Sequence, residues 1–314
     1  MKIAIHRSSI TVSVLWILFA GFQTLAQTSV QSEHPLLKLS VTVTDRAGHP
    51  VDGVRKEDLQ LIDDGNPETI SYFSKEERPL ICGLVIDGSG SLKPLFQDVL
   101  KMANQIIEAN HSDDATFIIK FVSSDNVRTI QELTTDKNVL ANALRGLKVE
   151  MGQTAMIDGL YLAAQYAIAH RPGAGDHHIA LVLISDGEDR ASYYKDSDLF
   201  KLLTKSDLQV FVVGLVSELD NQQGLVRLSP RAKAEDLLTK LARETGGRAF
   251  LLKSPKELPD VINQLNPMLR AQYVIGYQPS KNPDKASRKV QVKVVASPDH
   301  DKWIVTNPRV LVGK

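Results

Sequence analysis

One stretch of eleven residues, Ile81–Ser91, constrains the fold of this chain more than any other. Residues 81–86 form an apolar run that is rich in β-branched side chains and follows Pro79 closely. Such a run predicts a strand buried on both faces, as in parallel sheets that are covered by helices. Glycines 88 and 90 then allow a tight turn. The turn carries three oxygen-bearing side chains that can converge on one point: Asp87, Ser89 and Ser91.

These side chains predict a site for a hard divalent cation. Carboxylate and hydroxyl oxygens suit Mg²⁺, Mn²⁺ or Ca²⁺, and the turn offers no thiolate or imidazole that would suit zinc. A glycine- and serine-rich turn that only reverses the chain is the alternative interpretation.

Residues 87–91, with the sequence Asp-Gly-Ser-Gly-Ser, resemble the D-x-S-x-S signature of von Willebrand factor type A domains, in the spelling that integrin I domains also use. The metal-ion-dependent adhesion site of that family needs two further parts, a threonine in a G-x-T loop and an aspartate that closes a later strand. Both follow in this order, as Gly-Gln-Thr at 152–154 and as Leu-Val-Leu-Ile-Ser-Asp at 181–186. A turn that merely reverses the chain would explain neither of them.

The resemblance implies a role for each of five residues. Ser89, Ser91 and Thr154 would touch the ion directly, and Asp87 and Asp186 would hold it partly through water. Because hydroxyl ligands are neutral, the ion would keep most of its positive charge and favour an incoming carboxylate. The expected cofactor is Mg²⁺, or else Mn²⁺ or Ca²⁺, and the expected partner is a protein that presents an acidic side chain.

Between residues 80 and about 270, apolar runs alternate with amphipathic segments, which predicts a mostly parallel sheet covered by helices on both faces. The predicted strands are 81–87, 115–123, 127–132, 178–185, 208–215 and 247–252. The predicted helices are 92–109, 136–146, 154–169, 196–205, 232–245 and 255–270. The link at 124–126 is short, so we expect the strand at 127–132 to be an antiparallel edge strand.

Strand patterns also flank this α/β unit. Residues 37–74 predict two hairpins, and strands are predicted at 273–277 and 289–295, with possible further strands at 303–306 and 310–312. Neither group has enough strands to bury a sheet face alone. We therefore predict a doubly wound α/β domain inserted in a small β-sandwich that the N- and C-terminal strands build together. This layout resembles a group of secreted bacterial proteins with von Willebrand type A-related domains.

The predicted domains follow from these patterns: a signal peptide at 1–26, N-terminal hairpins at 27–79, the type A domain at 80–271 and C-terminal strands at 272–314. The first segment has a basic start, an apolar run and small residues near position 26, as secretion signals do. Its apolar run is shorter than a membrane span requires. We expect a secreted or periplasmic protein with no membrane span after cleavage.

The composition excludes some classes of partner. Acidic and basic residues balance at 37 each, so no long-range field points to nucleic acid. The single Cys82 cannot form an internal disulfide, and its position within a strand predicts a buried apolar role.

Two loops at the expected metal edge are candidates for contacts with a partner. The first, Glu188–Asp196, contains Arg190, Tyr193 and Tyr194, and the second, Ser217–Arg231, contains Leu225 and Arg227. Exposed aromatic and arginine side chains are common binding anchors, although an ordinary solvated loop has a similar composition. Glu188 and Asp189 are expected to be solvated charges, with a supporting role near the metal as the alternative.

Enzymatic functions are not favoured. The sequence has no phosphate-binding G-x-x-x-x-G-K-[ST] loop, Ser89 lies outside any G-x-S-x-G turn, and His177 and His178 are expected at the surface. The favoured function is a metal-dependent binding or adhesion module. A non-catalytic subunit of a larger assembly, or a domain whose ion only orders its loops, remains as an alternative.

Overall fold

Of the two units into which the chain divides, Met1–His34 and Pro35–Lys314, only the second contains residues that the structure describes. The computed structural model describes residues 36–46, 48–75, 78–171, 177–206, 208–219, 228–270, 273–282, 285, 287–295, 302–306 and 310–312. The predicted signal peptide lies outside these ranges. Across the ranges that are described, no helix is both long and apolar enough to cross a membrane.

The centre of the second unit is a six-stranded sheet with the order β10-β9-β8-β5-β6-β7. Its strands are β5 (Leu80–Asp87), β6 (Ala115–Phe121), β7 (Val127–Thr134), β8 (His178–Ser185), β9 (Gln209–Gly214) and β10 (Ala249–Leu251). All neighbours run parallel except β7, which pairs antiparallel with β6 at the edge. The predicted sheet and its antiparallel edge strand are therefore confirmed.

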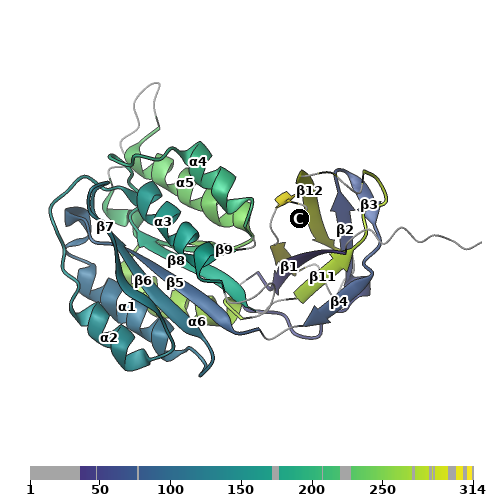
Figure 1. Ribbon diagram of the computed structural model, residues 1–314, viewed down its shortest axis with the longest axis horizontal. Coiled ribbons are helices and arrows are strands. Elements are labelled where there is room, and N and C mark those ends of the chain that lie inside the picture. Colours follow the sequence, from purple (N-terminus) through teal and green to yellow (C-terminus); the bar gives the residue numbers. More distant parts are fainter. Residues whose placement is uncertain are drawn as a thin grey trace, which may run out of the picture. The chain divides into compact units, whose positions relative to one another are not determined.

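Helices cover both faces of this sheet (Figure 1). They are α1 (Phe96–Glu108), α2 (Lys137–Arg145), α3 (Met156–Ala169), α4 (Asp196–Leu203), α5 (Pro230–Thr245) and α6 (Leu258–Met268). Alternate residues of β5 pack into two different cores: Leu84 and Ile86 face α1, α2 and α6, whereas Ile81 and Val85 face α3, α4 and α5. Cys82 is fully buried with the first group, and burial raises the pKa of its thiol to about 12.

The flanking strands form two four-stranded sheets with the orders β13-β1-β11-β4 and β14-β12-β2-β3. The N-terminal strands are β1 (Leu37–Thr44), β2 (Leu59–Asp63), β3 (Asn66–Glu68) and β4 (Tyr72–Lys75). The C-terminal strands are β11 (Tyr273–Tyr277), β12 (Ser287–Val294), β13 (Ile304–Thr306) and β14 (Val310–Val312). Each sheet mixes strands from both ends of the chain, and their apolar faces share one core. This is the predicted β-sandwich with an inserted α/β domain.

The predicted N-terminal hairpins are only partly present. The turn at Asp64 and Gly65 has positive φ angles of 46° and 84°, as a tight hairpin requires. Its second strand stops at Glu68, however, and the chain then crosses to the other sheet as β4. The first predicted hairpin is reduced to an isolated bridge between Thr44 and Pro50, because β1 already pairs with β11 and β13.

Candidate metal centre

The candidate site lies at the carboxyl ends of two neighbouring parallel strands. Because Ile86 of β5 pairs with Ile184 of β8, Asp87 and Asp186 leave the sheet at the same edge. The hydroxyl of Ser185 donates a hydrogen bond of 2.7 Å to Oδ2 of Asp87, which joins the two strand ends. Both aspartates are almost completely buried, with exposed fractions of 0% and 1%.

The turn after β5 gathers the hydroxyl groups around these carboxylates. The backbone N–H of Ser89 donates to Oδ1 of Asp87 at 2.9 Å. The hydroxyl oxygens of Ser89 and Ser91 lie 3.0 Å apart, and the Ser91 hydroxyl also stabilises the charged form of Asp186. Four of the five predicted site residues therefore belong to one hydrogen-bonded cluster.

Thr154, the fifth predicted residue, lies just before α3 and is only 4% exposed. Its backbone carbonyl accepts hydrogen bonds from the N–H groups of Arg190 (2.8 Å) and Ala191 (3.1 Å), which belong to the loop after β8. In the same segment, the N–H of Glu150 donates to the carbonyl of Gly88 in the turn after β5, at 2.9 Å. The three predicted segments therefore meet at one edge of the sheet.

The two buried carboxylates repel each other. Burial, together with the nearby charge of Asp186, raises the pKa of Asp87 to about 7, against hydrogen bonds from Ser89 and Ser185 that lower it. Burial also raises the pKa of Asp186, although the Ser91 hydroxyl opposes this. Among the described residues, no basic side chain forms a salt bridge with either aspartate; Arg190 pairs with Glu188 instead. Such a pair of charges favours a bound cation.

The chemistry of the donors fits a hard divalent cation. The candidate site offers two carboxylates and three hydroxyl groups, all of them oxygen donors, which Mg²⁺, Mn²⁺ and Ca²⁺ prefer. Within the described ranges, no group of three or more His, Cys, Asp or Glu side chains is placed to hold a metal ion. A metal at this edge would therefore depend on Ser and Thr hydroxyls as well as on the two aspartates.

The loop after β8, predicted to contact a partner, is held against the start of α3. The Asp158 carboxylate accepts hydrogen bonds from the N–H groups of Tyr193 (2.8 Å) and Tyr194 (2.9 Å). Tyr193 is 82% exposed, whereas the ring of Tyr194 stacks on Tyr161 with centroids 3.8 Å apart. Arg190 is exposed and pairs with Glu188. Of the second predicted loop, Leu225 and Arg227 lie outside the described residues.

The expectation that Asp189 is a solvated charge is wrong. Its Oδ1 accepts hydrogen bonds from the N–H of Ile157, at 3.1 Å, and from the hydroxyl of Ser192, at 2.5 Å. Burial raises the pKa of this carboxyl, and its hydrogen bonds oppose the shift. Asp189 thus accepts hydrogen bonds from N–H groups of the first turn of α3, which have no acceptor within the helix and stabilise negative charge.

The expectation that the histidine pair is at the surface is also wrong for His178. This residue begins β8, which lies between β5 and β9, and only 7% of it is exposed. Burial lowers the pKa of its imidazole to about 3, and the charges of Arg78 and Arg171 act in the same direction. His178 is therefore a neutral residue of the folded core.

Sequence reasoning missed two residues that support the loop before Thr154. Lys120 is 4% exposed in β6 and forms an ion pair with Glu150. Glu150 also accepts hydrogen bonds from Asn126 (2.8 Å) and Arg128 (3.2 Å). A single lysine within the apolar run Phe117–Phe121 was the available signal, because a buried ammonium group requires an acidic partner.

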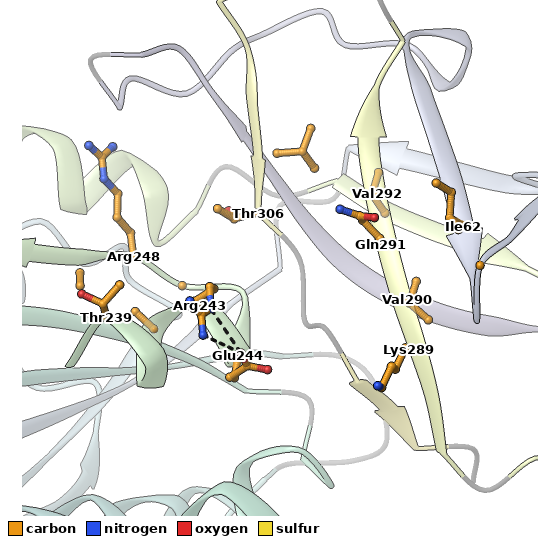
Figure 2. Close-up of a pocket in the computed structure, with 15 residues that line it drawn as sticks. Ile62, Thr239, Arg243, Glu244, Arg248, Lys289, Val290, Gln291, Val292 and Thr306 are labelled. Carbon is orange, nitrogen blue, oxygen red and sulfur yellow. Dashed lines mark hydrogen bonds and ion pairs between the residues drawn. The ribbon is translucent and has the colours of Figure 1, made fainter. Parts of the chain in front are cut away.

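A separate pocket of about 760 Å³ has charged and apolar walls, formed by residues of α5, the start of β10, and β12 (Figure 2). Its charged groups include Arg248, Lys289 and the ion pair of Arg243 with Glu244, at 3.2 Å. Residues 243–248 precede β10, which begins at Ala249, so this pocket lies at the amino edge of the parallel sheet. It is therefore distinct from the candidate metal centre, which occupies the carboxyl edge.

Comparison with known proteins agrees with this arrangement. The family model described as the von Willebrand factor type A domain matches residues 83–264, which is more than half of the chain. No curated protein sequence shows a significant match.

Several solved structures are similar to this chain. The pilus adhesin SpaC from Lactobacillus rhamnosus GG, in its open conformation, aligns with a TM-score of 0.50 at 10% identity, over 84% of this chain and 43% of that one. A von Willebrand factor type A protein from Catenulispora acidiphila aligns over 90% and 75%, at 12% identity and a TM-score of 0.45. Proximal thread matrix protein 1 from the mussel byssus, with a zinc-occupied MIDAS motif, aligns over 65% and 48%, at 15% identity and a TM-score of 0.48. This chain thus spans about half the length of the byssus protein, and the likeness to the adhesin is one of fold.

Proposed function

Because this chain belongs to the von Willebrand factor type A family, we propose that it is a non-catalytic module that binds a protein partner through a divalent cation. The observation that carries the proposal is the pair of buried aspartates, Asp87 and Asp186, at the carboxyl edge of the sheet. Burial raises the pKa of both carboxyl groups, and hydroxyl oxygens lie beside them. A bound cation would balance the two negative charges and use the hydroxyls as ligands.

Each residue of the site has a proposed task. Ser89, Ser91 and Thr154 offer neutral oxygen atoms as direct ligands, and Asp87 and Asp186 supply negative charge and orient those hydroxyls. A bound Mg²⁺, or Mn²⁺ or Ca²⁺ in its place, would supply a positive charge with a coordination position open to a carboxylate. The acidic side chain of a partner is the ligand that this position favours.

We place this function outside the cytoplasm. The support is the basic and apolar pattern of residues 1–26, which is typical of a secretion signal. A chain exported in this way would meet its partner in the periplasm, at the cell surface or in the medium. The same signal disfavours the alternative of a subunit that works with a cytoplasmic ATPase.

Partner capture in the presence and absence of metal tests the proposal. The purified chain and its Thr154→Val variant are immobilised and exposed to the extracytoplasmic fraction of the source cells, in Mg²⁺ and in EDTA. We expect one or more proteins to bind the unmodified chain in Mg²⁺ alone. The variant should bind them poorly under both conditions. Capture that persists in EDTA would contradict the proposal and would favour an ion that only orders the loops.

A further inference from the structure

Two large apolar or aromatic side chains are much more exposed than the rest. Met151 is 92% exposed and Tyr193 is 82% exposed. Among the other described residues of this kind, the next value is 58%, for Leu228. Singly exposed apolar side chains need no explanation, but these two lie close to the same site.

Met151 lies over the turn that carries the candidate metal ligands. Its Sδ atom is 3.4 Å from the position that a Cβ atom on Gly90 would occupy, and Gly90 separates Ser89 from Ser91. Met151 also precedes Thr154 by three residues. Its thioether therefore lies next to the hydroxyl groups of the proposed site.

Tyr193 belongs to the loop after β8, which contacts the segment that carries Thr154. The Thr154 carbonyl accepts hydrogen bonds from Arg190 and Ala191 of this loop, and Asp158 holds the backbone of Tyr193 at 2.8 Å. The ring of Tyr193 packs edge-on against Tyr194, with centroids 5.3 Å apart and planes at 87°. The phenol is thus exposed but supported by a fixed aromatic neighbour.

These two side chains contribute little to folding and suit contact with another molecule. A methionine adapts to partners of different shape, and a tyrosine supplies a large contact area at a small entropic cost. Arg190, in the same loop as Tyr193, is exposed, and its guanidinium pairs with Glu188 at 2.6 Å. The surface around the site therefore offers exposed apolar area next to the position proposed for the cation.

We infer that Met151 and Tyr193 are contact residues beside the metal site, and that the partner presents an acidic side chain flanked by large apolar side chains. This inference rests on the proposed function, since the carboxylate of the partner would bind at the metal. The apolar neighbours of that carboxylate would cover Met151 and Tyr193, while its charge would complement the cation. A partner whose acidic residue has only small or polar neighbours would leave both side chains in water.

Defined peptide libraries test this inference. One library holds nine-residue peptides with a central Asp and random neighbours, and the second replaces that Asp by Asn. Both are selected on the purified chain in Mg²⁺. We expect selection of Asp over Asn, and enrichment of Leu, Ile, Phe or Met next to the Asp.

Variants then locate the contact. Met151→Gln keeps the length of the side chain but makes it polar, and should weaken the best selected peptide about tenfold, while Met151→Leu should restore most of the affinity. Ile168→Gln is the matched control, because Ile168 is 41% exposed near the end of α3, away from the site. Mg²⁺ affinity should be the same in all three variants.

The outcomes separate the two claims. If the chain does not prefer Asp over Asn in Mg²⁺, the proposed function fails and this inference fails with it. If Asp is preferred without apolar neighbours, or if Met151→Gln binds the selected peptide as tightly as the unmodified chain, the inference alone is overturned.

Discussion

Arg270, at the end of the α/β domain, forms an ion pair of 2.7 Å with Asp114, which lies just before β6. Asp114 also accepts hydrogen bonds from the N–H of Leu80, at 2.8 Å, where β5 begins, and from the N–H of His111, at 2.6 Å. Burial acts to raise the pKa of this carboxyl, but the bonds from Arg270 and the backbone outweigh it and lower the pKa. The charged carboxylate therefore stabilises the fold where the inserted domain joins the sandwich strands.

Asp114→Ala should destabilise the protein by about 3 kcal/mol, because it leaves a partly buried guanidinium without its carboxylate and two N–H groups without their acceptor. Urea unfolding followed by circular dichroism measures this change. Glu244→Ala is the control: it removes a more exposed ion pair with Arg243 and should cost less than about 1 kcal/mol. Equal losses in both variants would show that Asp114 has no special role.

His178 should make stability depend on pH. The pKa of its imidazole is about 3 in the folded chain and near 6.5 when unfolded. Between these values the unfolded chain binds the proton more tightly, so stability is full above pH 6.5 and falls as the pH decreases. At pH 5 the free energy of unfolding should be about 2 kcal/mol lower than it is well above pH 6.5.

Unfolding of the unmodified chain and of His178→Gln, measured from pH 8 to pH 5, isolates this contribution. The variant should lose less stability than the unmodified chain over that range, whatever its stability at pH 8. Parallel curves would mean that the imidazole titrates normally in the folded state.

Glu150 should influence the metal site without touching it. Glu150→Ala removes the acceptor of Lys120, Asn126 and Arg128, so the segment that carries Thr154 loses its support. Mg²⁺ affinity should fall about tenfold, as it does when residues that orient metal ligands are changed. Asp125→Ala is the matched control, since it removes an exposed carboxylate whose described partner is Ser123; isothermal titration should show unchanged affinity there.

The two adjacent tyrosines should behave differently when truncated. Tyr194→Ala removes the ring that stacks on Tyr161 and should destabilise the chain by about 1–2 kcal/mol. Tyr193→Ala should leave the free energy of unfolding within about 0.5 kcal/mol, because its ring is mostly exposed. Thermal unfolding of both variants distinguishes a structural tyrosine from one that is available to a partner.

The sequence was sufficient to predict the strands and helices, because each has its own local pattern of apolar residues, and to predict that Asp87 and Asp186 lie at the same edge of the sheet. Asp87 and Asp186 each end an apolar run, and the ends of parallel strands meet at one edge of a sheet. The sandwich could be predicted because strand patterns at both ends of the chain lacked partners of their own.

Interactions between distant residues could not be predicted in this way. Nothing in the sequence indicates that Asp158 binds the backbone of a loop 35 residues later, since backbone N–H groups occur at almost every position. His178 follows a polar segment and resembles a surface residue, but β5 and β9 cover it on both sides. The crossing of the chain after Glu68 likewise depends on which strands β11 and β12 pair with.

Titration of Mg²⁺ into the unmodified chain and into Asp87→Asn, followed by calorimetry, tests the central claim most directly. The amide oxygen introduced by this substitution can still accept the hydrogen bond from the N–H of Ser89. It gives up the bond from the Ser185 hydroxyl, but the loss of one charge relieves the repulsion with Asp186 and offsets that loss. The variant should therefore remain folded and melt no lower than the unmodified chain in EDTA. We predict one bound Mg²⁺ for the unmodified chain and loss of most of that affinity in the variant. Equal Mg²⁺ binding by both proteins would show that the cation does not bind at this edge of the sheet.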